Sequence, residues 1–359
     1  MKVIILIVLS ILFSIEIFSQ EKKLNYDGDF RFRVEENFGG NAQLWSREVV
    51  RFRFRTSYQI NSLFQVNVGL GTGSKANPKT NDITLGNFND KLELNLFTAN
   101  VGFAYKSIKI HGGKFDSPFV QTEMVWDSDI YPQGISFKYN SLPDRKLGSF
   151  VSALYFAIDD QPMLKDTYMS GLQVGMKYRS NENTNALFCA SFYNYSIGAF
   201  KKNNILSAIT ADDIRTNFLR PDSTGYLNNF RLLDGILKIN SSIGSVPVGV
   251  VLDFVYNIGA KKDNKGFSAD FFAGKSLNPK DFKLLYGISF AETDAVMAAF
   301  SNDNTLQPTN YFQHSFAFDY VLLMNTSLNL TYYLYRKLET NDTTNPYLSR
   351  IRLNLSLRF

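Results

Sequence analysis

The sequence is poor in the residues that build most metal and redox sites. It has one cysteine, Cys189, two histidines and two tryptophans among 359 residues. A single cysteine cannot close a disulfide within the chain, and together with two histidines it supplies too few ligands for a typical zinc or haem site. We therefore expect no metal and no cofactor. The net charge of +5 is too mild to indicate nucleic acid as a partner.

Long apolar runs are also missing after the first twenty residues, where no stretch reaches the roughly 18 residues of a membrane-spanning helix. Aromatic residues, by contrast, reach 15%, with 32 Phe and 19 Tyr, which favours β-strands. At 45% hydrophobic residues the chain is too apolar to stay disordered. Its length suits either two ordinary domains or one large barrel.

The N-terminus has the layout of a secretory signal peptide. Lys2 provides a short positive region, an apolar stretch follows from Val3 to Phe13, and the charged run Glu21-Lys22-Lys23 comes after a less uniform segment. We predict a signal peptide over 1–20, cut near Ser19 or Gln20, with a retained helical anchor as the alternative. The mature chain would then be 21–359.

Hydrophobic and polar residues alternate with a period of two along the mature chain. The segment 29–35, DFRFRVE, carries charge at every second position, and 50–60 and 350–359 repeat this pattern. Side chains in a strand point alternately to opposite faces, so each segment has one charged and one apolar face. A dyad repeat of this length predicts an all-β fold, a closed antiparallel transmembrane β-barrel.

The alternation divides the chain into about sixteen strands, from 25–37 to 347–359, with 14–18 as the accepted range. Their connections alternate between short and long, which is typical of outer-membrane barrels with short periplasmic turns. Within 91–105 the apolar residues change parity, and a β-bulge near 97–99 would reconcile the two halves.

Arginine occupies the polar face of the first, second and last segments. Arginine facing hydrocarbon would cost about 2–4 kcal/mol each near the midplane, so these side chains are expected to face the lumen. Closing the barrel places the last strand beside the first and joins them into one basic ladder: Arg31, Arg33, Arg51, Arg53, Arg55, Arg350 and Arg352. A basic ladder favours anions in a pore. The alternative is that Asp29, Glu35 and Glu93 pair with it and leave a weakly selective pore.

Two further polar side chains, Lys109 and His111, fall on the lumen parity of their strand. Neither histidine is accompanied by a nucleophile motif such as G-x-S-x-G, so we do not expect an enzyme. The last residue, Phe359, ends an alternating strand in the manner of the signal that the barrel insertion machinery recognises.

The stretch 113–139, GKFDSPFVQTEMVWDSDIYPQGISFKY, carries a family resemblance. With the opening GDFRFR at 28–33, it resembles the Bacteroidetes-type putative porin family, which is similar in architecture to the phosphate-selective porins O and P. The resemblance implies a third loop, near 115–132, that folds into the lumen as a constriction. Its candidate residues, with the lysine just before it, are Lys114, Asp116, Glu123, Trp126, Asp127 and Asp129. The alternative is that Trp126 and the carboxylates only hold the loop together.

The resulting prediction is a porin of the Gram-negative outer membrane, surrounded by lipid, that passes small anionic or polar solutes by passive diffusion. A homotrimer is compatible with it, although no stretch stands out as the interface. The alternative is an outer-membrane scaffold or adhesin whose lumen is plugged.

Overall fold

The computed structural model describes residues 23–39, 45–73, 79–86, 92–141, 146–159, 167–181, 183–197, 216–340 and 344–359. Regular structure in these residues is entirely β-strand, and they contain no helix long and apolar enough to cross a membrane. The strands are β1 Leu24–Phe38, β2 Trp45–Gln59, β3 Phe64–Thr72, β4 Ile83–Leu85, β5 Leu94–Tyr105, β6 Ile108–Lys114, β7 Gln133–Asn140, β8 Leu147–Asp159, β9 Thr167–Arg179, β10 Asn185–Ser196, β11 Arg231–Ile243, β12 Val246–Asn257, β13 Lys265–Gly274, β14 Phe282–Ala291, β15 Tyr311–Leu323, β16 Thr326–Lys337 and β17 Leu348–Arg358.

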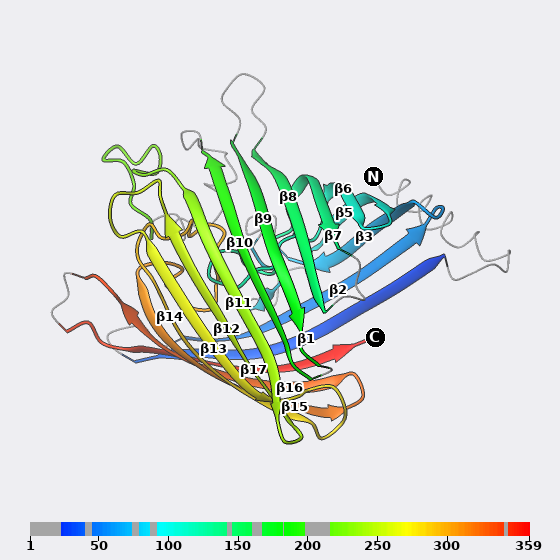
Figure 1. Cartoon of the computed structure of the whole chain (residues 1–359). Helices are drawn as coiled ribbons and strands as arrows, with labels where there is room; N and C mark the ends of the chain where they lie inside the picture. Colours follow the sequence, from blue (N-terminus) through cyan, green and yellow to red (C-terminus); the bar gives the residue numbers. More distant parts are fainter. Residues whose placement is uncertain are drawn as a thin grey trace.

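The strands form one antiparallel sheet that closes on itself, because β17 pairs with β1 along ten residue positions. Figure 1 shows them side by side in one strongly curved wall. β3 and β4 share one position in that wall, since both pair with β2, β3 along its second half and the three-residue β4 along its first. The wall therefore has sixteen strand positions, which confirms the predicted all-β closed antiparallel barrel.

The connections alternate in length around the barrel, as the sequence predicts. The tightest turns join β5 to β6, β11 to β12 and β15 to β16, and Lys106, Gly244 and Asn325 in these turns have positive φ. Such backbone conformations suit short hairpins, whose twist must match the strands. At the other end lie long connections, among them 115–132 and 292–310. We refer to the two ends of the barrel as the short-turn end and the long-loop end.

The change of parity in β5 is produced by a bulge. The register between β3 and β5 shifts at Gly69, so that Thr98 lies opposite Gly69 and Leu96 opposite Leu70, leaving Phe97 as the extra residue. Phe97 is buried, whereas Leu96 and Val101 on either side of the shift are exposed on the outer face. The predicted bulge near 97–99 is confirmed.

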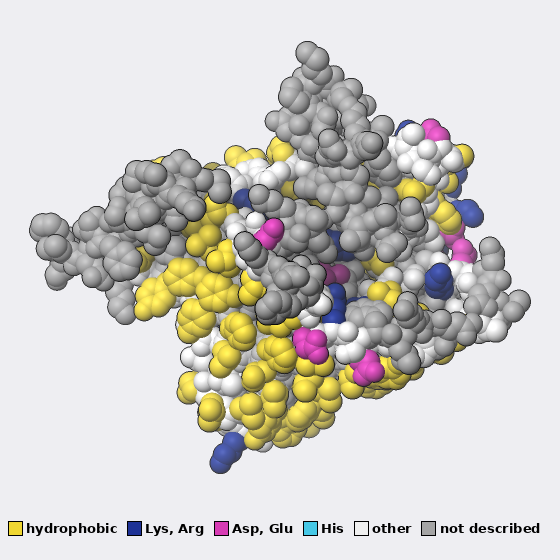
Figure 2. All heavy atoms as spheres, turned by 180° about the vertical axis from the view of Figure 1, so that it is seen from behind, with side chains coloured by type: hydrophobic (Ala, Val, Ile, Leu, Met, Phe, Trp, Pro, Cys, Tyr) yellow, Lys and Arg dark blue, Asp and Glu magenta, His cyan; other side chains and the backbone are white. Residues whose placement is uncertain are grey.

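The outer face of the wall is apolar and the inner face is mostly polar. Phe30, Val34 and Leu353 are exposed, whereas Arg33 and Arg352, which alternate with them, are buried. Figure 2 shows hydrophobic side chains gathered over a broad area of the outer surface. This is the distribution that a barrel in lipid requires, because charge on the outer face would lie in hydrocarbon.

Phe359 completes the closure of the barrel. Its backbone exchanges two hydrogen bonds with Gly28, of 2.9 and 3.0 Å, and its ring stacks on Phe52 at 6.3 Å between centroids. The ring is 55% exposed on the outer face. The predicted signal peptide, 1–20, lies outside the described residues.

Candidate functional site

The alternation of Arg and apolar residues brings arginine to the inner face of three neighbouring strands, β17, β1 and β2. Arg31 lies directly opposite Arg51 across β1 and β2, and Glu35 lies opposite Arg352 across β1 and β17. We call these residues the arginine stripe. Its members are the seven arginines named above, together with Arg47 of β2, which the sequence analysis did not single out.

Carboxylates of the same strands hold the stripe together. Asp29 accepts from Arg51 at 3.0 Å and from Arg53 at 2.8 Å. Glu35 accepts from Arg352 at 2.8 Å and from Arg47 at 2.5 Å. Because a strand places these carboxylates next to arginines on the adjacent strands, the pairing is a direct result of the register.

A carboxylate from the long-loop end joins the same network. Asp82, just before β4, contacts Arg31 at 2.5 Å and Arg33 at 3.0 Å. Burial by itself would raise the pKa of Asp82, but Arg31 and Arg33 hold it below its ordinary value. Asp82 is thus an ionised member of the arginine network.

The segment 115–132, between β6 and β7, makes polar contacts with the stripe. Asp129 lies 3.0 Å from Arg53 and 3.6 Å from Arg51, and the Tyr131 hydroxyl accepts from Arg53 and Arg55. The more exposed Asp116 lies 3.6 Å from Arg55. These loop carboxylates therefore touch the arginines directly rather than facing them across an open gap.

The same segment also contacts the opposite wall. The Val120 backbone N–H donates to Gln173 of β9, and the Gln121 carbonyl accepts from Lys238 of β11. Thr122 is hydrogen-bonded to Asp253 of β12. Segment 115–132 therefore touches inward-facing side chains on strands as far apart as β2 and β12.

Apolar packing fixes the middle of this segment. Trp126 is 1% exposed, stacks on Phe300 at 5.8 Å between centroids, and meets Phe156 edge-on at 5.7 Å. Its indole N–H donates to the Ile130 carbonyl. Phe300 belongs to the connection 292–310, and its backbone carbonyl accepts a hydrogen bond from the Asp127 N–H at 2.8 Å. Two long connections are thus joined to each other and to inner residues of β8.

The remaining acidic residues of the segment do not contact the arginine stripe. Asp127 accepts from the Asp129 N–H and is almost fully buried, and burial together with Glu123 and Asp303 raises its pKa well above the ordinary value. Removal of water from around Glu123, with further repulsion from Asp303 and Asp129, raises the pKa of Glu123 to about 7. The segment therefore carries two kinds of carboxylate: those in ion pairs with arginine, and those that are buried without an arginine contact.

Three cavities lie along the inner wall. One of about 400 Å³ is lined by Arg55, His111 and Asp116, and another of about 590 Å³ by Glu123, Lys238 and Asp270. The third, of about 740 Å³, lies at the short-turn end and is lined by Lys109 and other basic residues. Lys114, at the end of β6, is partly buried and lines none of these three cavities.

The sequence analysis missed several residues that the fold brings to these sites. Lys138 and Lys177 line the third cavity, and the lumen parity of their strands would have identified both. Asp82 and Phe300 had no such signal, because both belong to connections without periodicity. Within the described residues no group of three or more His, Cys, Asp or Glu side chains is placed to hold a metal ion.

Comparisons with known proteins give the same architecture. The profile of the family described as "Putative porin" matches residues 41–241. Among solved structures, OprB of Pseudomonas putida superposes with a TM-score of 0.65 at 10% identity, covering 94% of this chain and 95% of that one. OmpF of Salmonella typhi, solved with daunomycin, gives 0.56 at 12% identity, covering 94% and 97%. The OmpT loop-deletion variant of Vibrio cholerae gives 0.54 at 11%, covering 94% and 100%. No curated protein matches.

Proposed function

Since this chain belongs to the family described as "Putative porin", we propose that it is a passive diffusion channel of the outer membrane for small hydrophilic solutes, with a preference for anions. The family and the closed barrel support the channel. The preference for anions is argued from the charges on the inner face. No bound nucleotide or metal is needed, because the solute gradient drives the flux.

The observation that carries the preference is the imbalance of the arginine network. Among the residues that the structure describes, the stripe has eight arginines, including Arg350, and the carboxylates seen to form ion pairs with it are Asp29, Glu35, Asp82, Asp116 and Asp129. Positive charge on the wall of a pore lowers the electrostatic barrier for anions. These arginines outnumber the five carboxylates, and the resulting excess of positive charge favours anions even though the arginines are bonded to the protein.

We propose further that 115–132 narrows the passage. Its polar contacts with β2 and its apolar contacts with β8 support that role, since a segment held at both sides can restrict the cross-section. The exposed Phe359 at the end of β17 supports recognition of that strand by the barrel insertion machinery. Removal of residues 1–20 as a signal peptide and association into a homotrimer belong to the same proposal.

Single-channel recording tests the proposal. We would reconstitute the mature chain in a planar bilayer and measure conductance steps and the reversal potential under a potassium chloride gradient. We expect discrete conductance steps and a reversal potential shifted toward the equilibrium potential of chloride. A reversal potential shifted toward the equilibrium potential of potassium would contradict the preference for anions.

A second candidate, an outer-membrane scaffold or adhesin with a plugged lumen, is favoured by one observation. Connections 115–132 and 292–310 form an apolar cluster with inner residues of β8–β12, of which Trp126 and Phe300 are members. A folded barrel that inserts into the bilayer and stays electrically silent at every voltage would support this candidate over the channel.

A further inference from the structure

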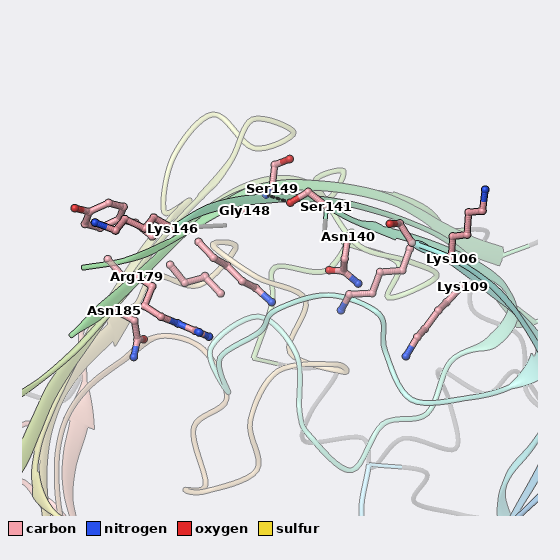
Figure 3. Close-up of a pocket in the computed structure, with 15 residues that line it drawn as sticks. Lys106, Lys109, Asn140, Ser141, Lys146, Gly148, Ser149, Arg179 and Asn185 are labelled. Carbon is pink, nitrogen blue, oxygen red and sulfur yellow. Dashed lines mark hydrogen bonds between the residues drawn. The ribbon is translucent and has the colours of Figure 1, made fainter. Parts of the chain in front are cut away.

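Basic side chains gather at the short-turn end of the barrel, away from the arginine stripe. Their cavity, of about 740 Å³, is lined by Lys106, Lys109, Lys138, Lys146, Lys177 and Arg179. Figure 3 shows Lys109 and Arg179 pointing into the space beneath the sheet, whereas Lys106 points away from it. None of the described residues that line this cavity carries a carboxylate.

The strand register places two of these lysines directly against each other. Lys109 of β6 is the cross-strand partner of Lys138 of β7, on the inner face. Like charges in that relation destabilise a sheet. The Lys138 ammonium donates to the Pro118 carbonyl at 2.9 Å, which orients it but supplies no counter-charge. The sheet thus maintains an unfavourable pair at this position.

A second pair of cations lies two strands away. Lys177 and Arg179 are two residues apart on β9 and share its inner face with Gln173, which bonds to segment 115–132. The Lys177 ammonium lies 5.5 Å from the centre of the Phe150 ring. Between the two pairs runs β8, where the residue opposite Lys177 is Gly148, so β8 places no side chain between them at that position.

The arginine stripe differs from this cluster in how its charges are compensated. Asp29, Glu35 and Asp129 each contact two or more of the arginines, so the stripe is already bonded to the protein. In the cavity at the short-turn end, the cations have hydrogen-bond acceptors and an aromatic ring as neighbours, and none of the described lining residues is a carboxylate. A mobile anion is the partner that this cluster lacks.

We propose that Lys109, Lys138, Lys177 and Arg179 form an anion-binding site in the lumen, and that it takes an elongated organic dianion with an anionic group at each end. The spacing of adjacent strands, about 4.8 Å, sets β7 and β9 roughly 10 Å apart. One carboxylate would sit between Lys109 and Lys138 and the other beside Lys177 and Arg179. The side-chain amides of Asn140 and Asn185 line the same cavity and can donate to such groups.

This inference rests on the proposed channel for its effect on transport, but not for binding itself. The test uses the mature chain in a planar bilayer, with adipate added to each side in turn while chloride current is recorded. We expect adipate to block the current at concentrations about tenfold below those of acetate or inorganic phosphate, because only adipate has two separated charges. If phosphate and adipate blocked the current at equal concentrations, the proposal that the site takes a dianion with separated charges would be overturned.

Variants locate the site. The double change Lys138→Gln and Lys177→Gln should weaken block by adipate about tenfold or more, and the double change to Arg should retain it. Lys283→Gln is the matched control, since Lys283 lies on the inner face of β14 and does not line this cavity. Block that is unchanged in the Gln variant would overturn the inference. Heat-modifiable mobility in gels confirms that each variant is folded.

Binding without current separates the two proposals. Calorimetric titration of adipate into the detergent-solubilised barrel measures the site whether or not the barrel conducts. Binding that is lost in the Lys138→Gln, Lys177→Gln variant of a silent barrel would support the site and reject the channel. A conducting barrel that binds no adipate would support the channel and reject the site.

Discussion

Asp29 illustrates how closely the charges of the inner wall are balanced. Its carboxylate is shared by Arg51 and Arg53, and Asp129 of segment 115–132 contacts the same two guanidinium groups. Two carboxylates thus face two arginines within one small area. Removing either carboxylate leaves a fixed positive charge in a partly dry part of the lumen, where it acts more strongly than in water.

We therefore expect Asp29→Asn to raise the ratio of chloride to potassium permeability by roughly twofold or more. The measurement is the reversal potential in a salt gradient. Asn67→Asp, on β3 and outside the stripe, adds a negative charge to the inner wall and should move the reversal potential the opposite way. If Asp29→Asn left the ratio unchanged, the stripe would have no part in selectivity.

Glu123 should make the selectivity depend on pH. With a pKa raised to about 7, its carboxyl takes up a proton between pH 8 and pH 6, whereas an ordinary glutamate stays ionised over that range. The lumen becomes less negative as the pH falls, so the preference for anions should increase. Reversal potentials recorded from pH 8 to pH 6 measure the effect.

Glu123→Gln removes the titrating group and is the matching control. In this variant the reversal potential should stay nearly constant over the same range. A wild-type response that persists in Glu123→Gln would assign the titration to another carboxyl, such as Asp127, whose pKa is also raised, and would contradict the role of Glu123.

Among the elements, segment 115–132 is held in part by one buried side chain, Trp126. Trp126 joins it to Phe300 of the connection 292–310 and to Phe156 of β8. Replacing a buried aromatic residue by alanine typically costs about 3–5 kcal/mol. Because the wall of the barrel does not depend on this contact, that loss should loosen the segment and leave the barrel folded.

Trp126→Ala is therefore expected to increase single-channel conductance or its noise, and to expose 115–132 to proteases, while heat-modifiable mobility in gels is retained. Trp126→Phe keeps an aromatic ring and should stay close to the wild type. Identical conductance and protease resistance in Trp126→Ala would show that the segment is held mainly by its ion pairs with β2.

Individual elements also show where sequence was informative. The parity change in β5 was visible as a shift of Leu94 and Leu96 against Val101, and the bulge at Phe97 follows from it. β4 gave no such signal, because it has three residues and forms only beyond the end of β3, along the edge of β2 that does not pair with β1. The connection 292–310 reads as a loop, and its apolar residues acquire partners only after the barrel closes.

At the scale of the whole molecule, alternation alone predicted sixteen strand positions and an inward arginine stripe over β17, β1 and β2. Both follow from local periodicity and from closure. The identity of the ionic partners did not follow, since Asp82 and Asp129 reach the stripe from irregular segments far away in sequence. Of the basic cluster only Lys109 was predicted from the sequence, because its other cations lie on β7 and β9, far from Lys109 in the chain.

The apolar outer face leads to a prediction for the whole barrel. Leu284 of β14 is 51% exposed on that face, whereas its neighbour Leu285 lines an inner cavity. We expect Leu284→Lys to lower the stability of the barrel in lipid by up to about 4 kcal/mol, the upper end of the cost of a lysine on the lipid face. The fraction folded into vesicles across a urea series measures this, and Leu285→Lys, which points to the lumen, should cost less. Equal losses would contradict the assignment of the two faces.

The pairing of β1 with β17 has a consequence for assembly. These strands are separated by nearly the whole chain, so closure of the barrel depends on contacts between residues far apart in sequence. Such contacts have a large entropic cost of loop closure and form slowly. Until it forms, the sheet has two free edges, each a row of unsatisfied backbone groups able to recruit another chain. In the closed barrel the β1–β17 ladder leaves no free strand edge, whereas the same two strands are exposed edges in the sheet before closure. The unclosed intermediate, rather than the native barrel, is therefore the state that needs a chaperone against aggregation.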